Sequence, residues 1–235
     1  MRKLLVIGTV LLSSFIAHGQ EYIESNENIN ETVQDSLKTV DFKYREDQFY
    51  FGITHTLMQD KPAGFSPSSV SIGMNGGFLR DFPINKSRTV AIAPGVGYSY
   101  LNLRGNLGIT PENEHVILGS YKKSSLSLHA IDFPIELRWR NSTPYSHKFW
   151  RVYLGFKASY VFGDRTKTTT GDYSATFKGD PNVNKWLYGV YLSAGFNTWN
   201  VYMYYGLNNV YKDEVLKWDS NKLRLLNVGV MFYIL

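Results

Sequence analysis

Charged side chains recur at alternate positions in two neighbouring segments, residues 125–140 and 150–162. In a strand, alternate residues share a face, so each segment would gather its charges on one side and its apolar residues on the other. A short connection makes two strands antiparallel neighbours, which sets Asp132 and Glu136 beside Arg151 and Lys157. Because an unpaired buried charge is costly, we predict a network of ion pairs. Its members are Asp132, Glu136, Arg138, Arg151 and Lys157.

Candidate catalytic groups are sparse. Hydrolysis or acyl transfer needs a nucleophile or base beside a histidine. Outside residues 1–19 the histidines are His55, His115, His129 and His147. None of them has a convincing partner, so we expect interfacial or loop positions for all of them. We predict no catalytic residue, no cofactor and no metal site, with a lipid-modifying enzyme as the least favoured alternative.

Three aspartates of the segment 163–185 also fail to predict a site. They are Asp164, Asp172 and Asp180. A calcium loop places its carboxylates at closely spaced positions, and these are too far apart. We therefore expect a solvated loop.

The first residues have the composition of a secretory signal peptide. Arg2 and Lys3 precede an apolar run over 4–12, and Ala17 and Gly19 supply small residues for cleavage. The run is shorter than the roughly 20 residues that a membrane-spanning helix needs. We predict a signal peptide over 1–19, a flexible periplasmic tail over 20–47 and one folded domain over 48–235. With no cysteine in the chain, we expect neither a lipoprotein anchor nor disulfides.

Period-two alternation recurs from residue 49 onward, which predicts an all-β domain. One face of each segment is apolar, and the other is small, polar or charged. We expect eight strands, at residues 49–57, 70–78, 90–99, 125–140, 150–162, 186–196, 201–207 and 222–235.

The connections between these segments alternate between short and long. Residues 81–88, 141–147 and 197–200 are short, 102–123 and 163–185 are long, and 59–68 and 208–221 are intermediate. Short turns at one end and longer loops at the other are typical of outer-membrane barrels. We predict an eight-stranded antiparallel, up-and-down transmembrane β-barrel, surrounded by lipid in the bacterial outer membrane, with both termini in the periplasm. A soluble barrel or sandwich is the alternative, but its outer face should be polar.

Two irregularities are expected in the strands. Pro94 lacks a backbone donor and predicts a bulge in the third strand. Leu126 and Leu128 are out of phase with the apolar face of the fourth strand. Either a bulge near Ala130 resets the register of that strand, or its first part projects above the membrane.

An eight-stranded barrel is just wide enough for side chains to fill it. We favour structural filling by the charge network, and a gated pore or a proton path is the alternative. Inward glycines would make room for large inward tyrosines. The glycines are Gly73, Gly77, Gly95, Gly97, Gly155, Gly189, Gly195 and Gly229, and the tyrosines are Tyr50, Tyr153, Tyr191 and Tyr202.

Aromatic residues make up 15% of the chain, and barrels use such rings at both membrane interfaces. We expect interface anchors at Trp139, Trp150, Trp186 and Trp199. The formal net charge of +5 is small and the cations form no stripe, so we expect no nucleic-acid partner.

The strand over 227–235 alternates up to the last residue. An unpaired apolar edge strand invites aggregation, whereas pairing with the first strand would close a barrel and remove the edge. Its pattern resembles the signal by which the barrel insertion machinery recognises outer-membrane barrels. The residues that form this pattern are Asn227, Gly229, Phe232 and Ile234.

Several stretches together resemble the PorT family of outer-membrane barrels. They are FPIELRWRNSTP (133–144), KFWRVYLGFK (148–157), YVFG (160–163), SAGFNTWN (193–200) and NVGVMFYIL (227–235). The resemblance implies an eight-stranded barrel without enzymatic activity that helps to assemble or operate the type IX secretion and gliding machinery, with other envelope proteins as partners. The alternative is a stand-alone small barrel that is porin-like, supports the envelope or binds ligands through its external loops.

Overall fold

The computed structural model describes residues 47–61, 64–109, 115–119, 122–141, 150–170, 173–212 and 223–234. All of them lie in one of the chain's two compact units, Asp41–Leu235. The predicted signal peptide, nearly all of the predicted tail, His147, Asp172 and Leu235 lie outside the described residues.

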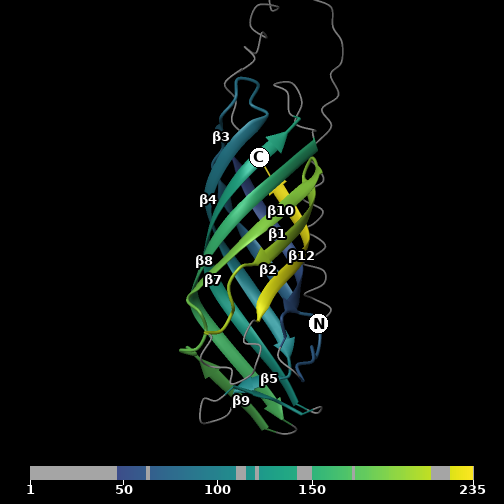
Figure 1. Ribbon diagram of the computed structural model, residues 1–235, viewed down its shortest axis with the longest axis vertical. Helices are drawn as coiled ribbons and strands as arrows, with labels where there is room; N and C mark the ends of the chain where they lie inside the picture. Colours follow the sequence, from purple (N-terminus) through teal and green to yellow (C-terminus); the bar gives the residue numbers. More distant parts are fainter. Residues whose placement is uncertain are drawn as a thin grey trace, which may run out of the picture. The chain divides into compact units, whose positions relative to one another are not determined.

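All regular elements of the described residues are strands (Figure 1). They are β1 (Gln48–Gln59), β2 (Ile72–Leu79), β3 (Phe82–Pro83), β4 (Val90–Gly105), β5 (Leu107–Ile109), β6 (His115–Ile117), β7 (Lys122–Arg140), β8 (Trp150–Thr170), β9 (Tyr173–Lys178), β10 (Trp186–Phe196), β11 (Trp199–Gly206) and β12 (Arg224–Ile234). No helix among the described residues is long and apolar enough to cross a membrane.

Eight of these strands form a closed ring in the order β1-β2-β4-β7-β8-β10-β11-β12, and every neighbouring pair is antiparallel. The pairing of β1 with β12, from Phe49 opposite Ile234 to Gln59 opposite Arg224, closes it. The predicted eight-stranded antiparallel barrel is confirmed. Closure leaves the long apolar strand β12 without a free edge.

The outer face of the ring is apolar and the inner face holds polar residues and tyrosines. Trp199, Phe49 and Leu154 are 67%, 62% and 56% exposed, whereas the inward Tyr153 is 0% exposed. A soluble barrel would place polar residues on that outer face. Tilted by about 45°, the outward run from Trp150 to Phe162 rises roughly 28 Å, close to the ~25 Å apolar band of outer-membrane barrels.

Three strands continue into the two segments that were predicted to be long loops, 102–123 and 163–185. β4 continues to Gly105, β7 begins at Lys122 and β8 runs to Thr170, where β9 pairs with it. β5 and β6 form a hairpin within the segment predicted as a long loop. Some of these residues carry polar side chains on both faces of the strand, and the others lie in short runs. The alternation of apolar and polar residues is therefore weak, and backbone pairing with neighbouring strands decides their conformation.

The bulge predicted at Pro94 is absent. Ala93 pairs with Glu136 and Gly97 with Asp132, so the β4–β7 register is the same on both sides of the proline. Pro94 lies opposite Ile135, next to Pro134. Because both prolines lack a donor at the same place, the ladder needs no extra residue there.

A register shift does occur at the predicted place, between His129 and Ala130. The extra residue, however, is Phe162 on β8, since His129 pairs with Gly163 and Ala130 with Val161. β7 keeps its phase, and Leu126 and Leu128 point inward like Asp132. The bulge therefore does not reset the phase of β7; beyond it, the inner face is apolar.

Beyond this shift the barrel changes polarity, and we call the part formed by 98–109, 115–119, 122–129 and 163–185 the extension. Its interior belongs to a buried cluster that includes Met58, Leu103, Leu126, Tyr211 and Leu223. Its outer face carries side chains such as Arg104, Lys123 and Arg165, which are exposed. This arrangement, apolar inside and polar outside, is that of a sheet in water.

Candidate functional site

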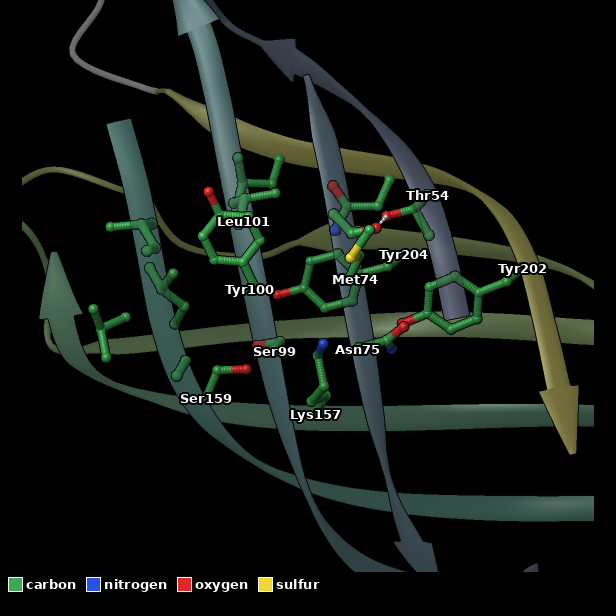
Figure 2. Close-up of a pocket in the computed structure, with 17 residues that line it drawn as sticks. Thr54, Met74, Asn75, Ser99, Tyr100, Leu101, Lys157, Ser159, Tyr202 and Tyr204 are labelled. Atoms are coloured by element: carbon green, nitrogen blue, oxygen red, sulfur yellow. Dashed lines mark hydrogen bonds between the residues drawn. The ribbon is translucent and has the colours of Figure 1, made fainter. Parts of the chain in front are cut away.

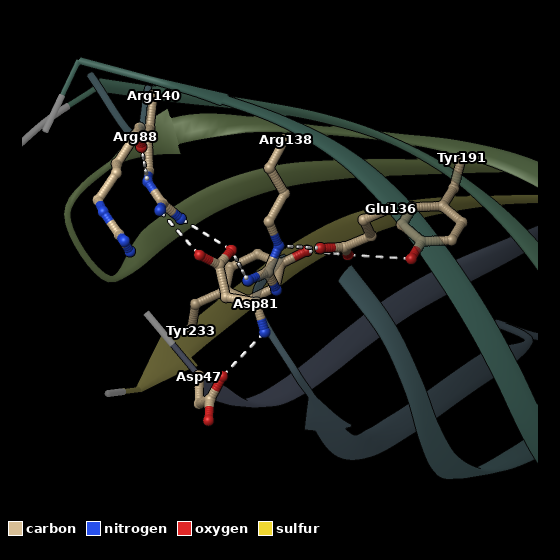
Figure 3. Close-up of polar contacts among 8 residues, drawn as sticks. All are labelled: Asp47, Asp81, Arg88, Glu136, Arg138, Arg140, Tyr191 and Tyr233. Carbon is tan, nitrogen blue, oxygen red and sulfur yellow. Dashed lines mark hydrogen bonds and ion pairs between the residues drawn. The ribbon is translucent and has the colours of Figure 1, made fainter. Parts of the chain in front are cut away.

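The interior of the barrel near its short turns is crossed by a network of charges (Figure 3). Glu136, Arg138 and Arg140 alternate along β7 and point inward. Asp81, just after β2, accepts two bonds from the guanidinium of Arg140, at 2.9 and 2.8 Å, and one from Nη1 of Arg138 at 3.2 Å. The Nε of Arg138 donates to Glu136 at 2.8 Å. All four side chains are 0–1% exposed.

Glu136 connects this network to the opposite wall. Its Oε1 accepts the hydroxyls of Tyr191 on β10 at 2.9 Å and Tyr233 on β12 at 3.0 Å (Figure 3). Hydrogen bonds therefore run across the barrel from β7 to β10 and β12. Paired charges in a water-poor interior hold their geometry, because separating them leaves a costly buried charge.

A second polar cluster lies further along the interior, at Asp132. Its carboxylate accepts Lys157 Nζ at 3.0 Å, Ser159 Oγ at 2.6 Å and Ser99 Oγ at 3.0 Å. The ammonium of Lys157 also lies 4.9 Å from the centre of the Tyr204 ring. Beside it is a cavity of about 50 Å³ (Figure 2). That volume holds only a few water molecules.

Tyrosines packed on glycines fill much of the remaining interior. A Cβ at Gly155 would overlap the Tyr191 ring, and one at Gly97 would overlap the Tyr50 hydroxyl. These two relations confirm the prediction for Gly97 and Gly155, but four other predicted glycines face backbone atoms or other side chains and not a tyrosine: Gly73, Gly95, Gly195 and Gly229. Gly189 lies instead against Tyr204, which was not among the predicted tyrosines.

In the structure the residues of the predicted charge network lie inside the barrel, but Glu136 has a different partner from the one predicted. Lys157 lies on Asp132 as expected from adjacent strands. Glu136 pairs with Arg138 on its own strand rather than with a cation of β8, and the guanidinium of Arg151 lies 5.8 Å from the centres of the Tyr153 and Tyr233 rings. From the sequence we expect Asp81 in a short turn, and its place in the network is not predicted. Asp81 comes two residues after Leu79, which points inward, and this spacing was the available indication that Asp81 also points inward.

The extension holds a buried cluster that contradicts two predictions. His115 Nε2 lies 2.8 Å from Asp180 Oδ2, with side chains 0% and 2% exposed. Asp164 accepts the backbone N–H of Asp180 at 2.6 Å and pairs with Lys185 at 3.3 Å. His115 therefore has a partner, and Asp164 and Asp180 are buried rather than solvated. His115 and Asp180 are 65 positions apart in the sequence, so the sequence alone does not predict their pairing.

Burial raises the pKa of Asp180, but hydrogen bonds from His115 and from the backbone and side chain of Asn182 outweigh it and lower that pKa overall. The ring of Tyr211 meets His115 edge-on at 4.8 Å, and burial raises the pKa of its hydroxyl. In the described part of the chain, no group of three His, Cys, Asp or Glu side chains could hold a metal ion. The cluster ties the β5–β6 hairpin to the segment after β9.

The remaining described histidines lie on the outer face. His129 Nδ1 is 2.6 Å from the Tyr98 hydroxyl, and His55 Nδ1 is 3.0 Å from the Ser71 carbonyl oxygen. His129 is also surrounded by the rings of Tyr98, Tyr100 and Phe162. Both positions agree with the expected interfacial placement.

The predicted anchors lie at the two ends of the apolar face. Trp139, Trp150 and Trp199 are 51%, 63% and 67% exposed beside the short turns. Trp186 begins β10 at the other end, where its ring lies 5.1 Å from that of Tyr160. Rings at both borders are the arrangement of an aromatic girdle.

The predicted insertion signal lies on β12. Phe232 contacts the Trp199 ring at 4.7 Å, and Ile234 is 56% exposed. Gly229 faces the backbone of β1 at Ile53 and Thr54, where a side chain would collide. Asn227 pairs with Thr56 and Tyr204.

A closed ring with an apolar exterior and a polar, filled interior defines a small outer-membrane β-barrel protein. Residues 25–212 match the outer membrane protein beta-barrel domain, and the chain belongs to that family. No curated protein matches the chain.

Among solved structures, the attachment invasion locus protein Ail of Yersinia pestis, in complex with the heparin analogue sucrose octasulfate, is 12% identical with a TM-score of 0.43 and covers 81% of this chain and 99% of that one. A second Ail structure is 13% identical with a TM-score of 0.41, covering 80% and 97%. A triple mutant of Rhodopseudomonas blastica porin is 8% identical with a TM-score of 0.20, covering 81% and 100%.

Proposed function

We propose that this protein is a non-conducting, non-enzymatic outer-membrane barrel that works as a docking component of the type IX secretion and gliding machinery. Both termini lie in the periplasm, and the extension projects from the cell. The observation that carries the proposal is the hydrogen-bonded chain Arg140–Asp81–Arg138–Glu136–Tyr233 across the interior. Because this chain fills the interior, the outer surfaces are the parts of the molecule that can contact other proteins.

The filled interior argues against the porin-like alternative. Asp81 and Glu136 balance Arg138 and Arg140, and all four are buried in contact with one another. Moving any of them aside would strand a buried charge at a cost of about 3–5 kcal/mol. An ion therefore has no ready path past this layer.

Planar-bilayer recording tests this part of the proposal. The purified full-length chain should insert without conductance steps. Stepwise, ion-selective conductance from the wild-type protein would refute a docking role based on a closed barrel.

The secretion role is supported by the resemblance of 133–144, 148–157 and 193–200 to PorT-family barrels, and membership of the outer-membrane barrel family is compatible with it. Its partners would be other envelope proteins of that machinery, with the barrel insertion machinery acting earlier. Deleting the gene in its own bacterium should reduce secretion of type IX cargo and gliding. A plasmid copy should restore both, and a deletion strain that secretes and glides normally would rule this role out.

The second candidate is a stand-alone barrel that binds a ligand through the extension. It is favoured by the length of β4, β7 and β8 beyond the apolar face and by the buried pair of His115 and Asp180 in the extension. Purification of the barrel from native membranes separates the two candidates. A defined complex with secretion components supports the first, and a barrel recovered alone supports the second.

A further inference from the structure

The outer face of the extension is basic. On the sheet β4-β7-β8-β9, one row of paired residues runs Arg104, Ser125, Lys167, Thr176. The adjacent row contains Arg165 paired with Lys178. These residues are outward, and the cations we call the basic face are all exposed: Arg104, Lys123, Arg165, Lys167 and Lys178.

The carboxylates of this region point the other way. Asp164 and Asp180 are buried inside the extension, where they pair with Lys185 and His115. No outward position on the described residues of these strands is Asp or Glu. None of the ion pairs between described residues includes a cation of the basic face. Serine and threonine hydroxyls lie between the cations and can donate further hydrogen bonds.

The basic face continues directly from the lipid-facing surface. Tyr98 and Phe162, 45% and 55% exposed, lie on the same strands with ring centres 6.3 Å apart. The first outward cation of β8, Arg165, comes three residues after Phe162, the extra residue of the bulge. At about 3.3 Å per residue, the cations begin within roughly 10 Å of the aromatic border. Interfacial aromatic rings sit at the level of the lipid headgroups, so the cations begin within roughly 10 Å of that level.

We propose that the basic face binds the phosphate groups of lipid headgroups in the outer leaflet. Guanidinium and ammonium groups recognise phosphate through charge-assisted hydrogen bonds. The place of the basic face beside the aromatic border favours a lipid as the ligand. The acyl chains of a lipid would pack on the exposed aromatic border while its phosphates reach Arg165 and Lys167. The leaflet assignment rests on the proposed orientation of the barrel.

Titration of the folded full-length chain in neutral detergent tests the proposal, with bisphosphorylated lipid A and dephosphorylated lipid A as paired probes. The phosphorylated lipid should bind more tightly than the dephosphorylated one, and added salt should weaken the binding of the phosphorylated lipid. A surface cation contributes about fivefold to binding of an anionic lipid. The R165Q/K167Q/K178Q variant should therefore lose at least about tenfold in affinity for the phosphorylated lipid and little for the dephosphorylated one.

A matched variant controls for net charge. K61Q/K86Q/K212Q removes the same charge from exposed lysines outside the basic face and should bind like the wild type. Equal affinity for both lipids, or unchanged affinity in R165Q/K167Q/K178Q, overturns the proposal. So does binding of a soluble sulfated polysaccharide that is as tight as lipid binding, because it would show that acyl chains contribute nothing.

The orientation of the barrel is tested separately by single-cysteine labelling. Because the chain has no cysteine, only the introduced one can react. S174C, on the exposed side of β9, should react with a membrane-impermeant maleimide on intact cells. Labelling only after permeabilisation would overturn the proposed orientation and the outer-leaflet assignment together. Labelling on intact cells without lipid selectivity in the titration would overturn the lipid proposal alone.

Discussion

At the residue scale, Asp81 bridges two buried arginines, Arg138 and Arg140. It accepts three hydrogen bonds from two arginines and is itself 0% exposed. A carboxylate in such a position does not strengthen the fold by its charge alone, because burying it is costly. Its removal, however, leaves Arg138 and Arg140 buried with fewer acceptors.

The D81N variant should lower the free energy of unfolding by about 3–5 kcal/mol, the usual cost of breaking a buried ion pair. Urea unfolding of the barrel in lipid vesicles measures it. D60N removes a carboxylate that is 47% exposed and 4.0 Å from Arg224, and it should unfold close to the wild type. Equal midpoints for D81N and the wild type would show that the arginines find other acceptors.

The buried pair of His115 and Asp180 predicts a pH dependence of the extension. The pKa of Asp180 is lowered from its ordinary value of 3.8 in the folded protein. A lowered carboxyl pKa adds stability that is complete above the unfolded value and is lost as pH falls through the folded value. The protection factor of the β6 amides, which corrects their hydrogen-exchange rate for its intrinsic pH dependence, should therefore fall on acidification below pH 3.8.

D180N supplies the control for that measurement. Because the amide carries no charge, its exchange at β6 should already be faster at neutral pH and should change less on acidification. If the wild type and D180N show parallel pH profiles, another group controls the extension.

At the scale of elements, β7 passes through two environments without changing phase. Near Trp139 its outward side chains are apolar and its inward ones charged, whereas near Leu126 the polarity is reversed. A strand can do this because side-chain direction depends only on the pleat, while the medium on each side decides which residue type is stable there. The reversal at His129 marks the boundary between lipid and water.

This boundary predicts that the extension and the membrane part tolerate different changes. L126D places a carboxylate at a position that is 6% exposed inside the extension, where an unpaired charge is strongly destabilising. It should open β8–β9 to protease while the rest of the barrel stays inserted and protected. S125D, on the outer face of the same strand, should remain resistant. Complete loss of insertion by L126D would show that the two parts do not fold separately.

At the scale of the whole molecule, closure of the ring by β1 and β12 removes both free edges of the sheet. Phe232 takes part twice, through its backbone pairing with Phe51 and Trp199 and through its ring contact with Trp199. Closure and recognition by the insertion machinery therefore both involve the same residue, and they need separate tests.

Removing residues 232–235 should prevent folding both in lipid vesicles and in cells, because part of the β1–β12 pairing is lost. F232A keeps the backbone pairing, so it should fold in vesicles but insert poorly in cells if the residue acts as a signal. Protease protection reports both. Normal insertion of F232A in cells would remove Phe232 from the predicted signal.

Much of the membrane part could be predicted from alternation alone. The eight strands, the apolar outer face and the inward positions of Asp132, Glu136 and Lys157 follow from a period of two residues. The alternation does not predict the ends of β4 and β8 in the extension, because in stretches such as 163–170 both faces carry polar side chains. The partners of Asp81 and His115 were also missed, since neither residue lies near its partner in sequence.

The sequence by itself determined which side of each membrane strand every residue occupies, because the pleat is local and requires no knowledge of neighbours. Only the tertiary structure decided which residues meet. Asp81 reaches Arg140 across 59 residues, and His115 reaches Asp180 across 65. Those contacts depend on the register of each strand pair, and the closure of the ring sets all the registers together.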